Sequence, residues 1–361
     1  MITFRGDNVE EVFQIAVMSL REPYNMVKIP SRNGDVLMFK DPVCSTYNFP
    51  RERVMFLPER NCNPFFHFIE GLWMLAGRRD VEPLARFVKR MKEFSDDGNF
   101  LYGSYGYRWR NQFGYDQLYD VIQKLKDNKW DRRIVLSMWD PIHDLKYKGK
   151  DVPCNTQIYF KAYPTKELGE ENNQIKLDMT VCCRSNDLIW GAYGANAVHF
   201  SMLHEYIATM SGLSVGCYHQ ISNNAHVYLD VWNELDKKLS KGIVPHGYET
   251  DPDMTWLDLV QDKQNFDKDL NYFFNLFCSS KNNEELGGMW ITPDHFSNMN
   301  TFAYTAIPLV EAWNYYKQKD YKNAILQAST IKAPDWKRAC VEWLQRKEER
   351  SKKCLKNKEV K

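Results

Sequence analysis

Two stretches of sequence decide the fold around the residues that indicate chemistry. They are DVPCNTQIYFKAY at residues 151–163 and IKLDMTVCCRSND at residues 175–187. Apolar and polar residues recur with a period of two over residues 157–163 and 175–181, which predicts two β-strands. A third such segment covers residues 134–139. Cys154 comes just before one strand, and Arg184 comes just after another. We therefore expect a hairpin that brings this thiol and this guanidinium to one edge of a sheet.

The residues at that edge indicate covalent chemistry. A cysteine reacts as its thiolate, and a nearby guanidinium favours the thiolate electrostatically. An arginine can also hold a phosphate through two parallel hydrogen bonds. Most cysteines are small buried hydrophobic residues, so Cys154 alone would not establish a nucleophile. Together with Arg184 it predicts covalent chemistry on a phosphorylated small molecule.

The remaining segments predict helices around the strands. Apolar residues recur at helical spacing over residues 8–20, with Asn8 as a possible N-cap, and again over residues 63–76 and 196–211. Glu70 is an acid within an apolar helix, so it either has a partner or a role, or lies on an exposed stripe. From about residue 233 the chain is helical and charged, with segments at 269–277, 301–316 and 336–350; Pro308 is expected to break or kink the second.

Composition excludes several classes of protein. The chain has 361 residues, with 48 Lys and Arg against 47 Asp and Glu, a net charge of +1. This balance does not favour bulk nucleic-acid binding. No uncharged apolar run is long enough to span a membrane, and the first residues show no apolar signal region. The nine cysteines have no disulfide-framework or paired Cys-x-x-Cys spacing. We expect a reducing compartment and a cytoplasmic protein without a metal site.

Several ordered motifs give a resemblance to a known family. They are Arg32-Asn-Gly34, the helix with Glu70, Tyr105-Gly-Tyr-Arg-Trp-Arg110, Asp131-Arg-Arg133 with Ser137-Met-Trp139, Pro153-Cys154, Arg184-Ser-x-Asp187 with Gly191, and His226-Val-Tyr228. In this order they resemble the thymidylate synthase superfamily, which includes the pyrimidine nucleotide hydroxymethylases, over roughly residues 25–230. The resemblance implies an α/β (α+β) fold with a large mixed sheet flanked by helices. We divide the chain into a catalytic domain at 1–235 and a mostly helical C-terminal extension at 236–361.

The resemblance also implies a mechanism. Cys154 would add to C6 of a pyrimidine ring, and C5 would then attack the one-carbon unit of 5,10-methylenetetrahydrofolate. Glu70 would relay protons through water, and Tyr105 would help to remove the C5 proton or position that water.

Binding residues follow from the same motifs. Arg32, Arg184 and Ser185 would hold the 5'-phosphate, and His226 and Tyr228 the ribose hydroxyl. Arg132 and Arg133 would reach into a partner subunit's site, which implies a homodimer. Asp187 and Gly191 lie in the folate segment, and Arg60 would contact the folate glutamate tail.

Departures from the synthase pattern point to a different product. Asn155 replaces the histidine after the nucleophile, and the segment from Gly191 to Asn196 is one residue longer. Met91 stands where the synthase has a tryptophan that shields the methylene intermediate. Without the shielding tryptophan, water could reach the methylene carbon, which favours 5-hydroxymethylation. Asn196 can donate to O4 and accept from N3–H of uracil, which indicates dUMP as the substrate.

Four alternatives stay open at this stage. The chain could be a thymidylate synthase with an unusual C-terminus, a dCMP or CMP hydroxymethylase, or a catalytically silent nucleotide- or RNA-binding relative. A papain-like enzyme is disfavoured, since no histidine is placed as its base. His199 and His204 hint weakly at a metal site, but without a cluster of carboxylates.

Overall fold

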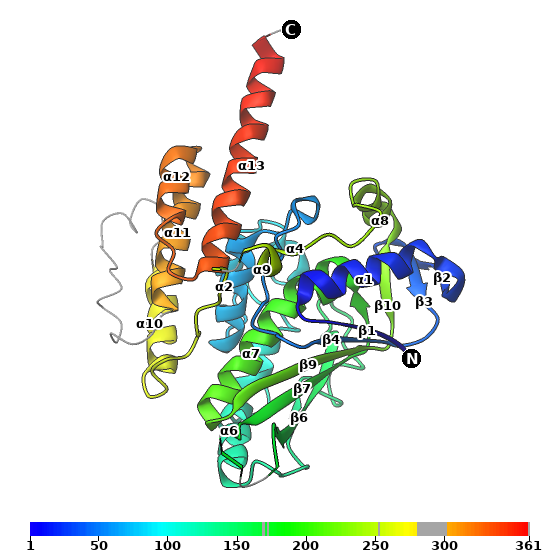
Figure 1. The fold of residues 1–361 in the computed structure, drawn as a ribbon, viewed down its shortest axis with the longest axis vertical. Coiled ribbons are helices and arrows are strands. Elements are labelled where there is room, and N and C mark those ends of the chain that lie inside the picture. The colour runs from blue at the N-terminus through cyan, green and yellow to red at the C-terminus, as the bar shows by residue number, and fades with distance from the viewer. Residues whose placement is uncertain (168–169, 172, 252, 280–301, 360–361) are drawn as a thin grey trace.

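Two mixed β-sheets lie on the side of the computed structural model away from the C-terminal helices (Figure 1). The structure describes residues 1–167, 170–171, 173–251, 253–279 and 302–359. Among these residues the larger sheet has six strands. Their order is β1 (Ile2–Gly6), β4 (Val43–Tyr47), β9 (Ser214–Ser222), β7 (Ile175–Cys183), β6 (Asn155–Pro164) and β5 (Val135–Ser137). β1 is parallel to β4 and β7 is parallel to β9, whereas the other neighbours are antiparallel.

The smaller sheet joins segments of the predicted site that are far apart in the sequence. Its strands are β2 (Met26–Ser31), β3 (Gly34–Phe39), β10 (Ala225–Tyr228) and β8 (Asn186–Asp187), in that order. Gly34, at the start of β3, has a φ of +113°, a conformation that favours glycine because it has no Cβ. This tight turn places Arg32 at the tip of the β2–β3 hairpin.

The sequence-predicted helix starts are confirmed by their caps. Asn8 accepts hydrogen bonds from the backbone N–H groups of Glu10 and Glu11 at the start of α1 (Val9–Arg21). Asn63 accepts one from Phe66 at the start of α2 (Pro64–Leu75), and Gly77 follows this helix with a φ of +68°. Such caps satisfy N–H groups that the first helical turn leaves unpaired.

Helix α7 (Asn196–Ser211) fills the centre of the molecule. It packs on β7 and β9 on one side and on α2 on the other, and nearly all of its side chains are buried. Short elements surround this layer. They are the 3₁₀ helices at Pro23–Asn25 and Pro58–Arg60, α3 (Glu82–Ala85), α4 (Met91–Phe94), α5 (Tyr105–Arg110), α6 (Gln117–Asp127), a π-helix (Leu188–Ala195), α8 (Leu229–Asp236) and α9 (Gly247–Thr250).

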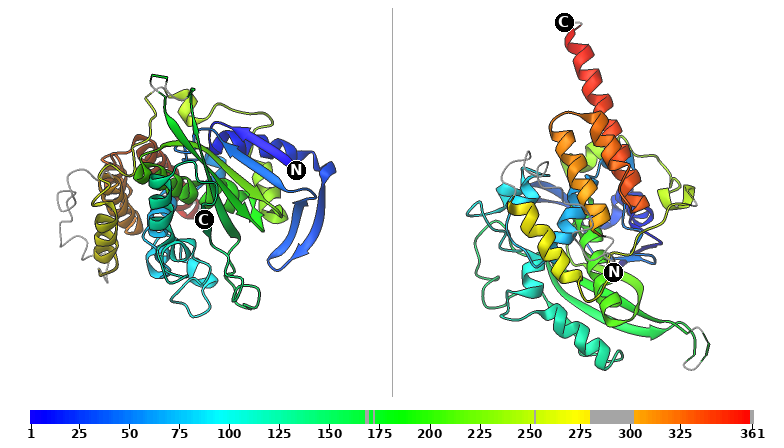
Figure 2. Two further views of the ribbon diagram at one scale, coloured as in Figure 1. Left: turned by 90° about the horizontal axis from the view of Figure 1, so that it is seen from below. Right: turned by 90° about the vertical axis from the view of Figure 1, so that its left-hand side faces the viewer.

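Beyond residue 235 the described chain is mostly helical, as expected. α10 (Phe266–Ser279), α11 (Ala303–Lys317), α12 (Tyr321–Ala328) and α13 (Pro334–Glu359) gather on one side of the body, and α13 projects from it (Figures 1 and 2). The aromatic rings of α11 and α13 cover α2. Phe65 lies 5.4 Å from Trp313 and 5.6 Å from Trp343, between ring centroids, and Phe68 lies 5.0 Å from Trp336.

The predicted helix at 301–316 appears as α11, and Thr301 lies outside the described residues. We expected a break or a kink at Pro308, and the break is wrong, because α11 runs through this residue. Proline has no N–H to offer to the carbonyl of Tyr304, four residues earlier. The backbone N–H of Lys332 donates to that carbonyl instead, at 3.2 Å. A neighbouring segment therefore supplies the hydrogen bond that the proline removes.

Candidate active site

The β6–β7 hairpin brings Cys154 and Arg184 together, as the sequence predicts. The strands pair antiparallel with Asn155 opposite Cys183, and the backbone N–H of Arg184 donates to the carbonyl of Cys154 at 2.8 Å. The guanidinium of Arg184 donates to the carbonyls of Pro153 (2.9 Å) and Val152 (3.0 Å). The thiol and the arginine thus share one short segment of backbone.

Burial dominates the electrostatics of the Cys154 thiol. Burial raises its pKa above the usual range, with a smaller increase from Asp151, while Arg184 and Arg32 oppose the shift. The expected assistance from a guanidinium is therefore present but outweighed. A partly exposed arginine lowers the cost of a thiolate less than burial increases it.

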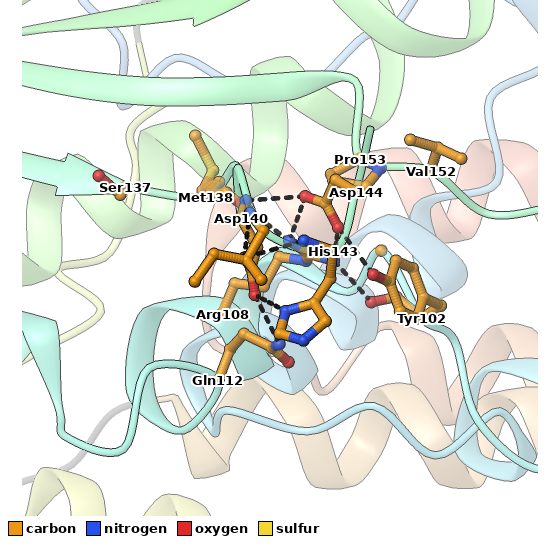
Figure 3. Close-up of polar contacts among 12 residues, drawn as sticks. Tyr102, Arg108, Gln112, Ser137, Met138, Asp140, His143, Asp144, Val152 and Pro153 are labelled. Atoms are coloured by element: carbon orange, nitrogen blue, oxygen red, sulfur yellow. Dashed lines mark hydrogen bonds and ion pairs between the residues drawn. The ribbon is translucent and has the colours of Figure 1, made fainter. Parts of the chain in front are cut away.

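A buried ionic network supports the segment that leads to Cys154. Arg108 and Asp144 are both fully buried and form two hydrogen bonds, at 2.7 and 2.9 Å (Figure 3). Asp144 also accepts from the hydroxyl of Tyr102 and from the backbone N–H of Asp140, while Arg108 donates to the carbonyl of Met138. This network fixes residues 138–144 against α5.

A second contact extends that support towards the nucleophile. The backbone N–H of Gly103 donates to the carboxylate of Asp151 at 2.8 Å. Asp151 is three residues before Cys154, so both ends of the loop between β5 and β6 are anchored. Such anchoring limits the positions that the thiol can adopt.

Tyr105 contacts the segment of the cysteine, and Glu70 lies on a second helix beside His199. The hydroxyl of Tyr105, at the start of α5, accepts from the backbone N–H groups of Cys154 (3.3 Å) and Asn155 (3.4 Å). Glu70, on α2, is buried, which excludes the exposed stripe considered above. Its Oε2 atom has no hydrogen-bond partner among the described residues, and it lies 3.9 Å from Nδ1 of His199.

The expected phosphate-binding arginines meet at the same loop. Arg32 donates to the carbonyl of Lys150 at 3.2 Å, two residues before the carbonyl that Arg184 contacts. Both guanidinium groups are exposed, and Ser185 is half-buried beside Arg184. Arg184 also lies 6.0 Å from the ring of Trp139. Two exposed guanidinium groups that donate to carbonyls can exchange these hydrogen bonds for bonds to an anion.

Hydrogen bonds between amide side chains fix the orientation of Asn196. The side-chain Nδ2 of Asn196 donates to Oδ1 of Asn186 (3.1 Å), and Nδ2 of Asn186 donates to the hydroxyl of Ser222 (3.0 Å). The segment before Asn196 is a π-helix at Leu188–Ala195 that is interrupted by non-helical backbone at Tyr193 and Gly194. Gly191 is required here, since a Cβ would lie 2.5 Å from Oδ1 of Asn186.

Asp187 caps that π-helix. Its carboxylate accepts from the backbone N–H groups of Ile189 (3.0 Å) and Trp190 (3.2 Å), and burial raises its pKa. His226, on β10, lies opposite Asp187 in the strand register, and Tyr228 lies two residues further along the same strand face. Nδ2 of Asn33 donates to the hydroxyl of Tyr228 at 3.5 Å, which links this strand to the Arg32 hairpin.

Comparison with known proteins identifies the family. The family model described as thymidylate synthase matches residues 32–267, more than half of the chain.

The chain belongs to the thymidylate synthase family.

Individual members of the thymidylate synthase family are similar over different shares of the chain. A protein of Pseudomonas phage M6 named deoxyuridylate hydroxymethyltransferase is 42% identical, over 96% of this chain and 95% of its own length. One of the same name from Bacillus phage SP01 is 42% identical, over 64% of this chain and 60% of its own. A crystal structure of thymidylate synthase from T4 phage aligns with a TM-score of 0.49 and 21% identity, covering 64% of this chain and 82% of that one.

Three of the residues predicted from the thymidylate synthase resemblance show no contact with Cys154 in the described part of the chain. Arg132 and Arg133 are exposed, and Arg133 pairs with Asp131 at 2.8 Å. Met91 is half-buried at the start of α4 and packs against the core. The role of the two arginines in a partner's site, and that of Met91 in the access of water, stay predictions.

Arg60 is buried rather than presented to solvent. Its guanidinium donates to the carbonyls of Ile189 and Tyr193 and lies 4.9 Å from the ring of Phe13. These contacts hold the π-helix that follows Asp187. A contact of Arg60 with a folate glutamate tail stays a prediction, and its hydrogen bonds in this structure are made to the segment between Asp187 and Asn196.

Sequence reasoning missed the surroundings of the two α7 histidines. His199 faces Glu70, whereas Nε2 of His204 donates to the carbonyl of Leu177 at 2.6 Å, so the two do not converge. No group of three potential metal ligands occurs among the described residues. In that part of the chain, no helix is both long and apolar enough to cross a membrane. The sequence did contain a signal that His199 lies on the same helix face as Asn196, because the two residues are three positions apart, about one helical turn.

Proposed function

We propose that the protein converts dUMP to 5-hydroxymethyl-dUMP, with 5,10-methylenetetrahydrofolate as the one-carbon donor and water as the final nucleophile. The observation on which this rests is the similarity, over nearly the whole chain, to a phage deoxyuridylate hydroxymethyltransferase. The residues of the site support it, because Tyr105 and Arg184 contact the loop that bears Cys154, and Glu70 lies beside His199, whose ring is 5.8 Å from that of Tyr105.

In this proposal Cys154 is the nucleophile. Its thiolate adds to C6 of uracil, which makes C5 electron-rich. Burial raises the pKa of this thiol in the free protein. When the phosphate takes the guanidinium of Arg184 from the carbonyls of Val152 and Pro153, the segment before the nucleophile can adjust. Tyr105 holds the N–H groups of Cys154 and Asn155, and Glu70 relays protons through water.

Asn196 selects uracil. Its amide can donate through one N–H to Asn186 and through the other to O4, while its oxygen accepts from N3–H. Asn186 is itself oriented by Ser222, which determines which end of the Asn196 amide faces the base. Cytosine presents an amino group where uracil has O4, and it would leave both amide groups mismatched.

Arg32, Arg184 and Ser185 hold the 5'-phosphate, and His226 and Tyr228 the ribose. Arg132 and Arg133 serve the partner subunit's site in a homodimer, for which their exposure leaves them available.

The residues near Asp187 suit a folate. The carboxylate of Asp187 keeps free acceptor sites after binding two N–H groups, which a pterin ring can use. Trp190, three residues further on, is 58% exposed and offers a flat apolar face to an aromatic ring. The cofactor would supply one carbon at the oxidation level of formaldehyde. The folate would lie along this segment, with Met91 on the path of water to the methylene carbon.

The test is an anaerobic incubation with dUMP and methylenetetrahydrofolate. Mass spectrometry reads the nucleotide, and absorbance reads the folate. We expect a hydroxymethyl nucleotide, tetrahydrofolate without dihydrofolate, and no product from Cys154→Ala. Thymidylate with dihydrofolate would make the protein a synthase, and turnover of dCMP alone would overturn the assignment of Asn196. Cys62→Ala, which changes a cysteine far from this loop in the sequence, is the matched control.

A further inference from the structure

Two buried ionisable side chains face each other without a direct hydrogen bond. Oε2 of Glu70 and Nδ1 of His199 are 3.9 Å apart, and their side chains are 9% and 3% exposed. Neither ring nitrogen of His199 has a hydrogen-bond partner among the described residues, nor does Oε2 of Glu70. Leaving such groups unsatisfied in the interior is unfavourable. At a separation above about 3.5 Å, two polar atoms can be joined by a water molecule that bonds to both.

His199 belongs to the cluster around the nucleophile. It lies on α7 one turn after Asn196, so the two side chains project from the same face of the helix. Its ring centroid is 5.8 Å from that of Tyr105, whose hydroxyl accepts from Cys154 and Asn155. His199 thus lies between the proposed base-recognition residue, the proton relay and the segment with the thiol.

Asn155 is the residue after the nucleophile, and its side chain is fully buried. Its backbone N–H donates to the hydroxyl of Tyr105, whose ring centroid lies 5.8 Å from that of His199. The synthase pattern has a histidine at this position, whereas here a buried imidazole lies on α7. A buried water is stable where two to four polar groups surround it, and Glu70 and His199 together offer three atoms without a partner among the described residues.

The other buried histidine of α7 shows what an ordinary structural role looks like. His204 is fully buried, and its Nε2 donates to the carbonyl of Leu177. It therefore anchors the helix to β7. His199 has no such anchor, and a polar ring without one is expected only where it has a ligand or a water to bind.

We propose that His199, with Glu70, positions the water molecule that adds to the C5 methylene carbon. This rests on the proposed function. At that stage the sulfur of Cys154 is bonded to C6 and a C5=CH₂ double bond is present, tetrahydrofolate having left. A bond forms from the water oxygen to the CH₂ carbon, and the electron pair moves through C5 to the C4 oxygen. The water proton passes to the carboxylate of Glu70. The enolate then collapses and expels the Cys154 thiolate from C6, without any change of oxidation state.

Partitioning of the intermediate tests the role of His199. An uncharged thiol, 2-mercaptoethanol, competes with the positioned water for the methylene carbon, and the two products differ in mass. In His199→Asn and His199→Gln we expect the ratio of thiol adduct to hydroxymethyl nucleotide to rise by at least about tenfold, the effect of one lost hydrogen bond. Tritium release from [5-³H]dUMP, which precedes water addition, should change less than the ratio.

His204→Asn is the matched control. It removes a buried histidine from the same helix, and it should lower thermal stability and leave the product ratio unchanged. Unfolded His199 variants would show in circular dichroism. An unchanged ratio in a folded His199 variant would overturn the proposal. If the wild-type protein gives no hydroxymethyl product at all, the proposed function fails instead.

A readout without turnover completes the test. In a high-resolution crystal structure of the free protein we expect an ordered water within hydrogen-bond distance of both Glu70 and His199. A direct contact between the two side chains, or a dry gap, would contradict the proposal whatever the kinetics show.

Discussion

Replacing Asp144 by alanine should destabilise the protein more than any exposed substitution. The carboxylate accepts four hydrogen bonds from Arg108, Tyr102 and the backbone of Asp140, and both charged side chains are fully buried. Its removal leaves the guanidinium buried without a counter-charge. Breaking such a pair costs about 3–5 kcal/mol, out of a total free energy of unfolding of about 5–15 kcal/mol.

Urea denaturation measures this loss, and two variants isolate its cause. Glu93→Gln removes one partner of the exposed Arg90–Glu93 pair, whose side chains are 74% and 68% exposed, and should change the free energy of unfolding by less than about 0.5 kcal/mol. Arg108→Met combined with Asp144→Ala buries no charge, so the double variant should be more stable than Asp144→Ala alone.

The same substitution should loosen the loop that leads to the nucleophile. Under native conditions, iodoacetamide should modify Cys154 faster in Asp144→Ala than in the wild-type protein, as read by peptide mass spectrometry. The argument is refuted if Asp144→Ala costs less than about 1 kcal/mol, or if the double variant is no more stable than the single one.

Four further predictions follow from the same structure. Asn196→Asp should shift the ratio of kcat/KM for dUMP over dCMP towards dCMP, because a carboxyl group suits the cytosine amino group; competition assays with both nucleotides measure it. Arg184→Met should raise KM for dUMP by about 10–100-fold, the loss of a charge-assisted contact to phosphate, with a smaller effect for the free nucleoside in steady-state kinetics. Burial raises the pKa of Glu10 to about 7; the stability contributed by its protonated form is complete below about pH 4.5 and is lost as the pH rises through 7, by about 3 kcal/mol, and Glu10→Gln should flatten this slope in denaturation curves at several pH values. Trp343→Ala should lower the free energy of unfolding by about 3–5 kcal/mol, because the ring is buried against Phe65 and no hydrogen bond of its indole is lost; urea denaturation tests it.

Local patterns were sufficient for the parts of the fold that local physics determines. Asn8 and Asn63 predicted helix starts because a cap bonds to N–H groups within its own first turn. The approach of Cys154 and Arg184 follows from strand alternation and antiparallel pairing alone. These features depend on residues close in sequence, or on the pairing of two neighbouring strands.

Other features depend on contacts between distant segments and could not be predicted. The Arg108–Asp144 pair joins residues thirty-six positions apart, and nothing in the spacing connects them. Pro308 predicted a helix break or kink because proline removes a helical hydrogen bond. The N–H of Lys332, which satisfies the free carbonyl, comes from a segment outside this helix. The pKa of Cys154 likewise reflects burial, which the sequence around it does not reveal.

The cover that α11 and α13 give to α2 has a consequence for the order of events during synthesis. Phe65 and Phe68 leave the ribosome long before Trp313, Trp336 and Trp343, the rings that pack on them. At about 5–20 residues per second the interval is on the order of tens of seconds. Throughout that interval the helix that bears Glu70 presents an apolar face to the cytoplasm of whatever cell makes it, open to chaperones and to other nascent chains. An active molecule can therefore form only after residue 343 has been added.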